Sequence, residues 1–113
     1  MVKIIIVKSL FEEIEKKFKR EADKIFDLFE TLQDNPRKGK ILGAVGSVLI
    51  KELKYKGFRF YFIVDGFKLK VITEEELTDL LMKFVRMSDK KRQKEVIEDI
   101  RHLLKTIGPK GFK

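Results

Sequence analysis

The chain has 113 residues, a formal net charge of +8, one histidine and no cysteine. This length predicts a single domain over residues 1–113 with one hydrophobic core. The absence of cysteine excludes disulfides, thiolate catalysis and cysteine-rich zinc sites, and a lone histidine argues against a transition-metal site built from protein ligands. We therefore expect neither a metal nor a cofactor, with carboxylate-bound magnesium as the open alternative.

The apolar runs of the sequence are short. None approaches the roughly 20 residues needed to cross a bilayer, and no apolar stretch typical of a signal peptide follows Met1. We therefore expect a cytoplasmic protein with no membrane partner.

The positive charge is concentrated in the middle of the chain. Residues 36–72 carry nine Lys or Arg and two Asp or Glu, whereas residues 1–35 carry seven and eight. Clustered cations release counterions when they bind phosphates, so this asymmetry favours a polyanion such as nucleic acid as a partner. The alternative is a solvated basic surface, because many Lys and Glu residues without cysteine are also typical of thermophile proteins.

The N-terminal third of the chain predicts a strand followed by helix. Residues 2–8 include a β-branched run, which predicts the strand. In residues 9–34 apolar residues recur every three or four positions, which predicts one long amphipathic helix or a helical hairpin. Ser9 and Glu12 have the spacing of a capping box at its start, and an Asn-Pro pair ends it. Residues 36–47 are basic and punctuated by glycine, and we expect a flexible connector there.

The clearest predicted element is a β-hairpin over residues 50–66. Side chains alternate in character along two runs, and Gly57 supplies the backbone freedom that a tight turn requires. In the second run Phe58 and every second residue after it share one face of the sheet. Arg59 and Tyr61 therefore share the other face, where an arginine is held beside a phenol.

The remaining residues predict two more strands and a terminal helix. The Asp-Gly pair at residues 65–66 is a turn signal, after which residues 67–72 are expected to form a third strand. Residues 73–80 are expected to form a short helical insert before a final strand, and Ser88 or Asp89 then caps a helix that ends at a Gly-Pro pair. The predicted fold class is α+β: a long N-terminal helix or helical hairpin packed on a twisted antiparallel sheet of about four to five strands, with a C-terminal helix.

The hairpin and the final strand carry residue types that suit phosphate binding. Cleavage of RNA by its own 2′-hydroxyl needs a base, a cation for the developing phosphorane charge and an acid. A lysine crowded by other cations can act as the base, and arginine presents a fixed fork of donors to phosphate oxygens. The alternative is that these residues form only the solvated face of a half-buried sheet. The set comprises Lys51, Lys54, Lys56, Arg59, Tyr61, Lys83 and Arg86.

Three other signals favour ordinary structural roles. Residues 39–46 are rich in glycine but match neither of the phosphate-loop patterns. The acidic residues Glu74, Glu75 and Glu76 suit the solvated start of a helix better than a metal site. His102 falls among the polar positions of the last helix, where we expect a surface histidine.

Two segments of the chain resemble a known family. Residues 51–61, KELKYKGFRFY, resemble the hairpin of RelE/ParE-superfamily toxins, especially the HigB-like branch. Residues 83–91, KFVRMSDKK, are similar to the Phe-Val-Lys-Lys segment that precedes the final helix of HigB-like proteins. The resemblance implies a RelE-like fold, in which a helical segment precedes an antiparallel sheet. It also implies RNase activity, and the RNase members of the family cut mRNA on the ribosome without a metal.

The resemblance also implies roles for individual residues. By position, Lys54 matches a hairpin residue that handles the phosphate, Arg59 matches the arginine that stabilises the transition state, and Arg86 matches a basic residue late in the sheet. These three are the predicted catalytic residues. The charge pattern and the resemblance together predict RNA contacts at Lys51, Lys56, Tyr61, Lys83, Lys90 and Lys91.

We therefore expect a toxin-like endoribonuclease that cleaves mRNA by metal-independent attack of the 2′-hydroxyl. Its expected partners are mRNA, the ribosome and a cognate antitoxin of a type II toxin–antitoxin system. Two alternatives stay open: a ParE-like toxin that acts on gyrase, and a non-catalytic RelE-fold module that binds nucleic acid or protein through its basic sheet.

Overall fold

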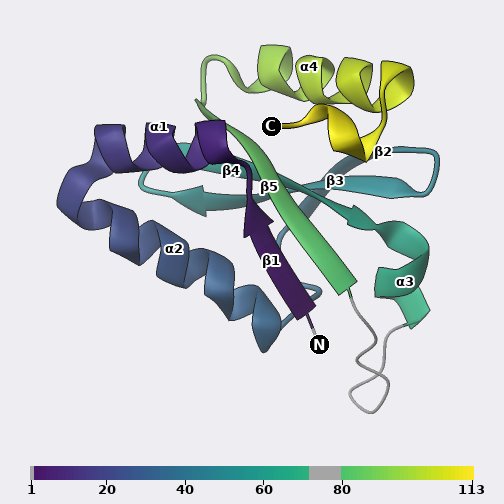
Figure 1. The fold of residues 1–113 in the computed structure, drawn as a ribbon, viewed down its shortest axis with the longest axis horizontal. Coiled ribbons are helices and arrows are strands. Elements are labelled where there is room, and N and C mark those ends of the chain that lie inside the picture. Colours follow the sequence, from purple (N-terminus) through teal and green to yellow (C-terminus); the bar gives the residue numbers. More distant parts are fainter. Residues whose placement is uncertain (1, 72–79) are drawn as a thin grey trace.

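The structure is a computed structural model that describes residues 2–71 and 80–113 (Figure 1). Its elements in chain order are β1 (Val2–Ile6), α1 (Lys8–Phe18), η1 (Lys19–Glu21), α2 (Ala22–Glu30), η2 (Thr31–Gln33), β2 (Lys40–Val45), β3 (Val48–Tyr55), β4 (Phe58–Asp65), α3 (Gly66–Val71), β5 (Leu80–Asp89), α4 (Gln93–Thr106) and η3 (Pro109–Gly111). The strands form one five-stranded sheet in the order β1-β5-β4-β3-β2. The α+β class is as predicted. None of the described helices is long and apolar enough to cross a membrane.

The sheet is mixed, so the predicted antiparallel sheet is wrong at one edge. Strands β2 to β5 pair antiparallel with their neighbours, but β1 runs parallel to β5. A hairpin forces its two strands to be antiparallel, whereas strands that are far apart in sequence are free to pair either way. Because β1 and β5 lie at opposite ends of the chain, no tight turn dictates the direction of β1.

The N-terminal helical segment is a hairpin of two helices. Helices α1 and α2 are separated by the short 3₁₀ turn η1, which begins at Lys19 with a φ of 51°. Phe11 of α1 stacks on Phe26 of α2 with ring centroids 4.9 Å apart. The two helices therefore fold against each other, and the helical-hairpin alternative is confirmed. We call α1 and α2 the helical pair.

The predicted capping box at the start of α1 is wrong. Val7 still donates its N–H to the carbonyl of Phe84 in β5, and α1 begins at the next residue, Lys8, without a side-chain cap. Ser9 consequently lies inside the first turn. Its hydroxyl donates a hydrogen bond to the main-chain carbonyl of Lys113, which ties the C-terminal residue to the first helix.

The aromatic part of the hydrophobic core lies between the helical pair and one face of the sheet, and the buried side of α4 extends the core on the other face. Phe29 of α2 stacks on Phe84 of β5 with ring centroids 3.7 Å apart and meets Phe60 of β4 at 5.4 Å, and all three side chains are fully buried. Phe18 of α1 meets Phe58 edge-on at 5.2 Å. The predicted aromatic face of β4 is therefore confirmed.

Helix α4 covers the opposite face of the sheet (Figure 1). Strand β2, which was not predicted, lies at the edge of the sheet next to β3. The sequence predicted a flexible connector over residues 36–47, but residues 40–45 pair with β3. Gly43 lies in this strand at a bulge, and a Cβ added there would collide with the guanidinium of Arg101 on α4. A glycine inside a strand often marks such a close approach. Glycine is depleted in strands, so Gly43 weakened the strand pattern of this segment.

Residues 67–72, predicted as a third strand, begin with a helix instead, because α3 follows β4 directly. The Asp65 carboxylate accepts a hydrogen bond from the N–H of Lys68 at 3.1 Å, which is the contact of a helix N-cap. The N–H of Gly66 donates to the carbonyl of Ser47 at 2.7 Å. The Asp-Gly pair therefore caps a helix and does not form a hairpin turn.

The predicted last strand and last helix are confirmed as β5 and α4. The predicted insert at residues 73–80 lies outside the described residues, apart from its last residue, which begins β5. Neither Ser88 nor Asp89 immediately precedes α4, so the predicted cap is misplaced; the Asp89 carboxylate instead accepts from the N–H of Arg92 at 3.0 Å, one turn earlier. The helix ends before Gly108, whose φ of 91° suits glycine, as predicted.

Replacing Phe29 with alanine is expected to lower the free energy of unfolding by about 3–5 kcal/mol, because the change leaves a cavity between α2 and the sheet. Chemical denaturation followed by circular dichroism measures this loss. Phe67→Ala is the matched control, since the Phe67 side chain is 69% exposed, and its effect should stay within about 0.5 kcal/mol. Equal losses in the two variants would contradict this location of the core.

Candidate nucleic-acid interface

The turn of the hairpin sets the geometry of the candidate interface. Lys56 and Gly57 occupy the two turn positions with φ values of 45° and 84°. Positive φ at both positions is the type I′ geometry that suits a two-residue hairpin. Lys54 of β3 and Arg59 of β4 are consequently direct cross-strand partners. Their side chains project from one face, which is the face covered by α4.

The Glu52 carboxylate supplies the counter-charge for this pair of cations. Its Oε1 lies 3.9 Å from Nζ of Lys54, and its Oε2 lies 3.9 Å from Nε of Arg59. Like charges directly opposite each other on neighbouring strands are destabilising, and a carboxylate close to both offsets that cost. The Glu52 and Arg59 side chains are 1% and 11% exposed, whereas that of Lys54 is 58% exposed. Lys54 is therefore the member of the pair that faces solvent.

Gln93, the first residue of α4, holds the Glu52 carboxylate from above the sheet. Its Nε2 donates a hydrogen bond to Oε2 of Glu52 at 3.2 Å. Oε1 of Glu52 and Nε of Arg59 are both buried, and neither has a hydrogen-bond partner within the described residues. Gln93 was not predicted as a site residue, because its contact depends on how α4 lies on the sheet. The only hint of such a contact in the sequence was Glu52, the one acidic residue in the stretch 51–61, which needs a partner if it is buried.

Tyr61 lies on the same face as Arg59 but is fully buried. Its hydroxyl lies 2.7 Å from that of Ser88, which donates to the carbonyl of Asp89 at 2.9 Å. Because a serine hydroxyl has one proton, Tyr61 is the donor to Ser88. Burial raises the pKa of the Tyr61 phenol, which keeps it protonated at neutral pH. Tyr61 thus presents no surface to an RNA base, contrary to its predicted contact with RNA.

The loop between β5 and α4 lies at the same end of the sheet as the hairpin turn, because Phe58 pairs with Asp89 in the register. The loop residues Lys90 and Lys91 are exposed, as is Arg92, which the sequence analysis did not single out. Positive charges from two neighbouring segments therefore gather at this end. We call the following five residues the basic end: Lys54, Arg59, Lys90, Lys91 and Arg92.

Two of the nearby cations are paired with exposed acidic side chains. Nζ of Lys56 lies 3.0 Å from Oε1 of Glu21 on η1, and this hydrogen bond raises the pKa of Lys56 and lowers that of Glu21. Nη2 of Arg92 lies 3.3 Å from Oε1 of Glu95, a contact that raises the pKa of Arg92. Water screens such exposed pairs, so they contribute little to stability. The pairing turns Lys56 toward the helical pair and away from α4.

Arg86 and Lys83 of β5 contact the C-terminal segment. The guanidinium of Arg86 lies 5.2 Å from the ring centroid of Phe112 and donates to the carbonyl of Val85 at 2.7 Å. Nζ of Lys83 donates to the carbonyl of Pro109 at 2.9 Å. Lys83 also lies about 20 Å from the loop end of β5 at the usual rise per strand residue. The structure therefore brings Lys54 and Arg59 together but leaves Lys83 far from the basic end.

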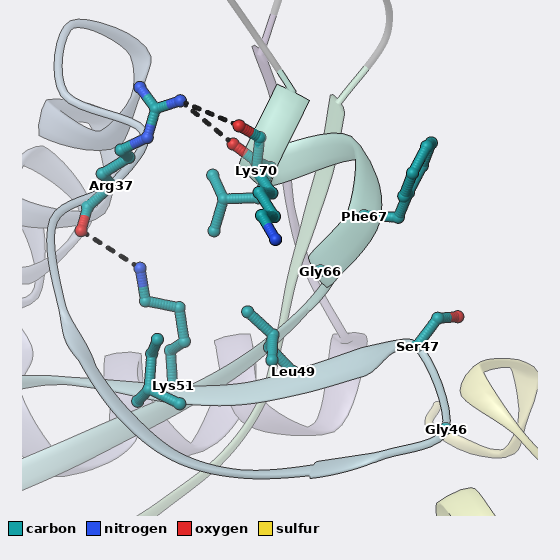
Figure 2. A pocket seen from close by; sticks show the side chains of 10 residues that line it. Arg37, Gly46, Ser47, Leu49, Lys51, Gly66, Phe67 and Lys70 are labelled. Carbon is teal, nitrogen blue, oxygen red and sulfur yellow. Dashed lines mark hydrogen bonds between the residues drawn. The ribbon is translucent and has the colours of Figure 1, made fainter.

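Lys51 lies on the opposite face of β3 from Lys54 and is 1% exposed. Its Nζ donates to the carbonyl of Arg37 at 3.2 Å and lies 5.7 Å from the ring centroid of Phe62. The side chain lines a cavity of about 570 Å³ (Figure 2). Burial lowers the pKa of its amine. The structure thus separates Lys51 from the other hairpin cations with which the sequence grouped it.

The basic end brings together side chains that can donate hydrogen bonds to an anion. Within the described residues, no group of three acidic or histidine side chains is placed to hold a metal ion. The acidic cluster predicted near residues 74–79 lies outside the described residues, and His102 is exposed on α4, as predicted. Ammonium and guanidinium groups on a rigid sheet can bind phosphate oxygens and offset the charge of a phosphorane.

Comparison of the chain with protein-family models, with curated proteins and with solved structures gave no match. The case for a function therefore rests on the residues of the chain and on their geometry.

The buried amine of Lys51 is expected to make stability increase with pH above neutrality. Its pKa in the folded protein is below the ordinary lysine value of 10.5, which applies to the unfolded chain. In the pH interval between these two pKa values, the unfolded chain binds more protons than the folded one. The free energy of unfolding of the wild type, relative to Lys51→Met, should rise through this interval and level off above it. Urea denaturation at a series of pH values measures the difference.

Lys51→Arg provides the control for this measurement, because a guanidinium does not lose its proton in this pH range. Its stability relative to Lys51→Met should not rise with pH. A wild-type difference that stays constant from neutral pH to 10.5 would contradict the depressed pKa of the buried amine.

Proposed function

We propose that this protein is a toxin-like endoribonuclease that cleaves mRNA on the ribosome without a metal ion, as the toxin of a type II toxin–antitoxin system. The observation that carries the proposal is the cross-strand pair of Lys54 and Arg59, which is held on the sheet beside the exposed cations of the basic end. The buried Glu52 carboxylate offsets the repulsion between these two cations. The exposed Lys54, Lys90 and Lys91 leave an excess of positive charge at this end, which an anionic ligand can neutralise.

In this proposal the 2′-hydroxyl of the RNA loses its proton to water and its oxygen attacks the adjacent phosphate. A 2′,3′-cyclic phosphate forms, the bond to the 5′-oxygen breaks, and that oxygen takes a proton from water. Arg59 stabilises the charge that develops on the phosphorane, since its guanidinium is a rigid fork of donors. Lys54 binds a non-bridging oxygen from the solvent side. Lys90 and Lys91 bind flanking phosphates and so set the position of the RNA.

Arg86 is the third proposed catalytic residue. It pairs with Tyr61 in the register, so its side chain leaves β5 on the face that also carries Arg59. Its guanidinium lies against Phe112 in the structure. In the proposed mechanism a contact with RNA replaces this stacking, which makes the C-terminal segment part of the site.

The order of the elements supports a RelE-like fold. The helical pair precedes the antiparallel strands β2 to β5, and a helix follows them. This is the arrangement that the resemblance to the RelE/ParE superfamily implies. The parallel strand β1 and the helix α3 are features beyond that expectation. A fold does not specify an activity, so the proposed reaction depends on the basic end.

Glu52 favours a second candidate, a non-catalytic RelE-fold module that binds nucleic acid or protein through its basic sheet. Arg59 is 11% exposed and has the Glu52 carboxylate 3.9 Å from its Nε. A phosphate that reaches this guanidinium must compete with the carboxylate. In the binding alternative the buried pair stays intact, and the exposed Lys54, Lys90 and Lys91 hold the ligand.

Arg59→Ala distinguishes the two candidates. If the protein is a nuclease, this variant should cleave mRNA about 10²–10³-fold more slowly, because a donor to the transition state is lost. Its RNA affinity should fall by less than about tenfold, because several phosphate contacts remain. Cleavage assays with and without ribosomes and filter binding at two salt concentrations measure these effects. Lys54→Ala should lower both cleavage and the salt dependence of binding.

Lys24→Ala is the matched control for these variants. Lys24 is an exposed cation on α2, which covers the other face of the sheet, so its loss should leave cleavage unchanged. Circular dichroism must accompany Arg59→Ala, which removes a partner of the buried Glu52 carboxylate. A wild-type protein that cleaves no mRNA in either assay would refute the nuclease proposal, and one that also binds no RNA would remove the nucleic-acid form of the alternative.

A further inference from the structure

A second site is built on the opposite face of β3 from the basic end. A cavity of about 570 Å³ is lined by residues of β3, the β2–β3 turn and α3 (Figure 2). Leu49 and Leu69 form apolar walls, and the side chains of Ile41 and Phe67 also line the cavity while remaining 58% and 69% exposed. This volume is typical of sites for small organic ligands, which are mostly apolar with a few polar groups.

All the charged side chains among the described lining residues are positive: Arg37, Lys51 and Lys70. Lys51 is 1% exposed, and Figure 2 shows its amine and the main chain of Arg37 on one side of the cavity, with Phe67 on the other. The amine donates a hydrogen bond to the Arg37 carbonyl at 3.2 Å. An ammonium has three N–H donors, so this group can bind a further acceptor.

The side of the cavity near Lys51 is held in place by Arg37. Nη2 of Arg37 donates long hydrogen bonds of 3.4 Å to the carbonyls of Leu69 and Lys70. These contacts join the loop before β2 to helix α3, as Figure 2 shows. A site that is already assembled loses less conformational entropy when a ligand binds.

The chemistry of this cavity selects one class of ligand. A buried ammonium is unfavourable unless an anion or other acceptors compensate it, so a carboxylate at the amine would be stabilising. Lys70 is exposed, and the Arg37 guanidinium donates to two carbonyls, so the Lys51 amine is the buried cation of this lining. One buried amine suits a monoanion better than a phosphate, whose several charged oxygens need more donors. The apolar walls and the exposed ring of Phe67 suit an alkyl chain.

We propose that this cavity binds a small amphipathic carboxylate, such as a medium-chain fatty acid, with its carboxylate on the Lys51 amine and its chain along Leu49 and Leu69 toward Phe67. The site goes beyond the proposed RNA cleavage and does not depend on it, because Lys51 and Lys54 project from opposite faces of β3.

Titration of the full chain with decanoate, kept below its micellar concentration, tests this proposal. Calorimetry gives the affinity, and amide NMR spectra locate the ligand. We expect decanoate to shift the amide signals of Ser47, Gly66 and Phe67, which lie at the cavity. Decanol has the same chain without the charge and should bind at least about tenfold more weakly, because it lacks the charge-assisted hydrogen bond.

Three variants sharpen this test. Lys51→Met should weaken decanoate binding by at least about tenfold and leave decanol binding unchanged. Lys54→Met removes a cation from the opposite face of the same strand and should affect neither ligand. Phe67→Ala should weaken both ligands, and its exposed position makes a folding defect an improbable cause.

Equal affinities for decanoate and decanol would show that the cavity recognises only apolar surface, which would overturn the carboxylate assignment. Decanoate binding that leaves the three amide signals unmoved, or that Lys51→Met does not weaken, would overturn the site itself. Absence of decanoate binding would also overturn the proposed site. If Lys51→Met does not fold, the comparison with decanol and the Phe67→Ala variant decide the outcome.

Discussion

Strand β4 lies in the interior of the sheet, and its pleat commits alternate side chains to two faces with opposite chemistry. Phe58 and Phe60 pack under the helical pair, where Phe60 meets Phe29 at 5.4 Å. Arg59 and Tyr61 must then point to the other face, because successive side chains of a strand alternate. A shift of register by one residue would place Arg59 against the helical pair and the rings under α4. The packing of the phenylalanine rings therefore fixes the direction of Arg59, although the rings lie on the opposite face of the sheet.

The buried Glu52 carboxylate determines how that arginine can act. It lies 3.9 Å from both Lys54 and Arg59, so it compensates two cations that would otherwise repel each other across neighbouring strands. Because this carboxylate lies close to the Arg59 guanidinium, any phosphate that binds Arg59 has to compete with it. The same residue thus stabilises the cross-strand pair and restrains its reactivity. In the proposed function, the balance between these effects distinguishes a nuclease from a module that only binds RNA.

The two cations of β3 belong to different surroundings, even though they are three residues apart. Lys54 is 58% exposed on the face of α4, whereas Lys51 is 1% exposed on the opposite face, beside a cavity next to α3. The positive charge of the central segment is therefore not one patch. An exposed ammonium suits the backbone of a large polyanion, whereas a buried ammonium with apolar neighbours suits a small ligand that brings one negative charge. One strand contributes to both proposed sites through its two faces.

The amino-acid sequence by itself determined the elements whose signals are contained in a few neighbouring residues. Alternation and Gly57 predicted the β3–β4 hairpin, and apolar residues at every third or fourth position predicted the helical pair and α4. Distant contacts decided the rest. Asp65 ends a strand and caps a helix where the β2–β3 turn accepts the next N–H, and Gly43 belongs to a strand because residues 40–45 pair with β3. Strand alternation already places Lys51 and Lys54 on opposite faces. Tertiary structure alone decided that Lys51 is buried beside Arg37 and that Gln93 of α4 contacts Glu52, because these contacts form between segments that are far apart in sequence.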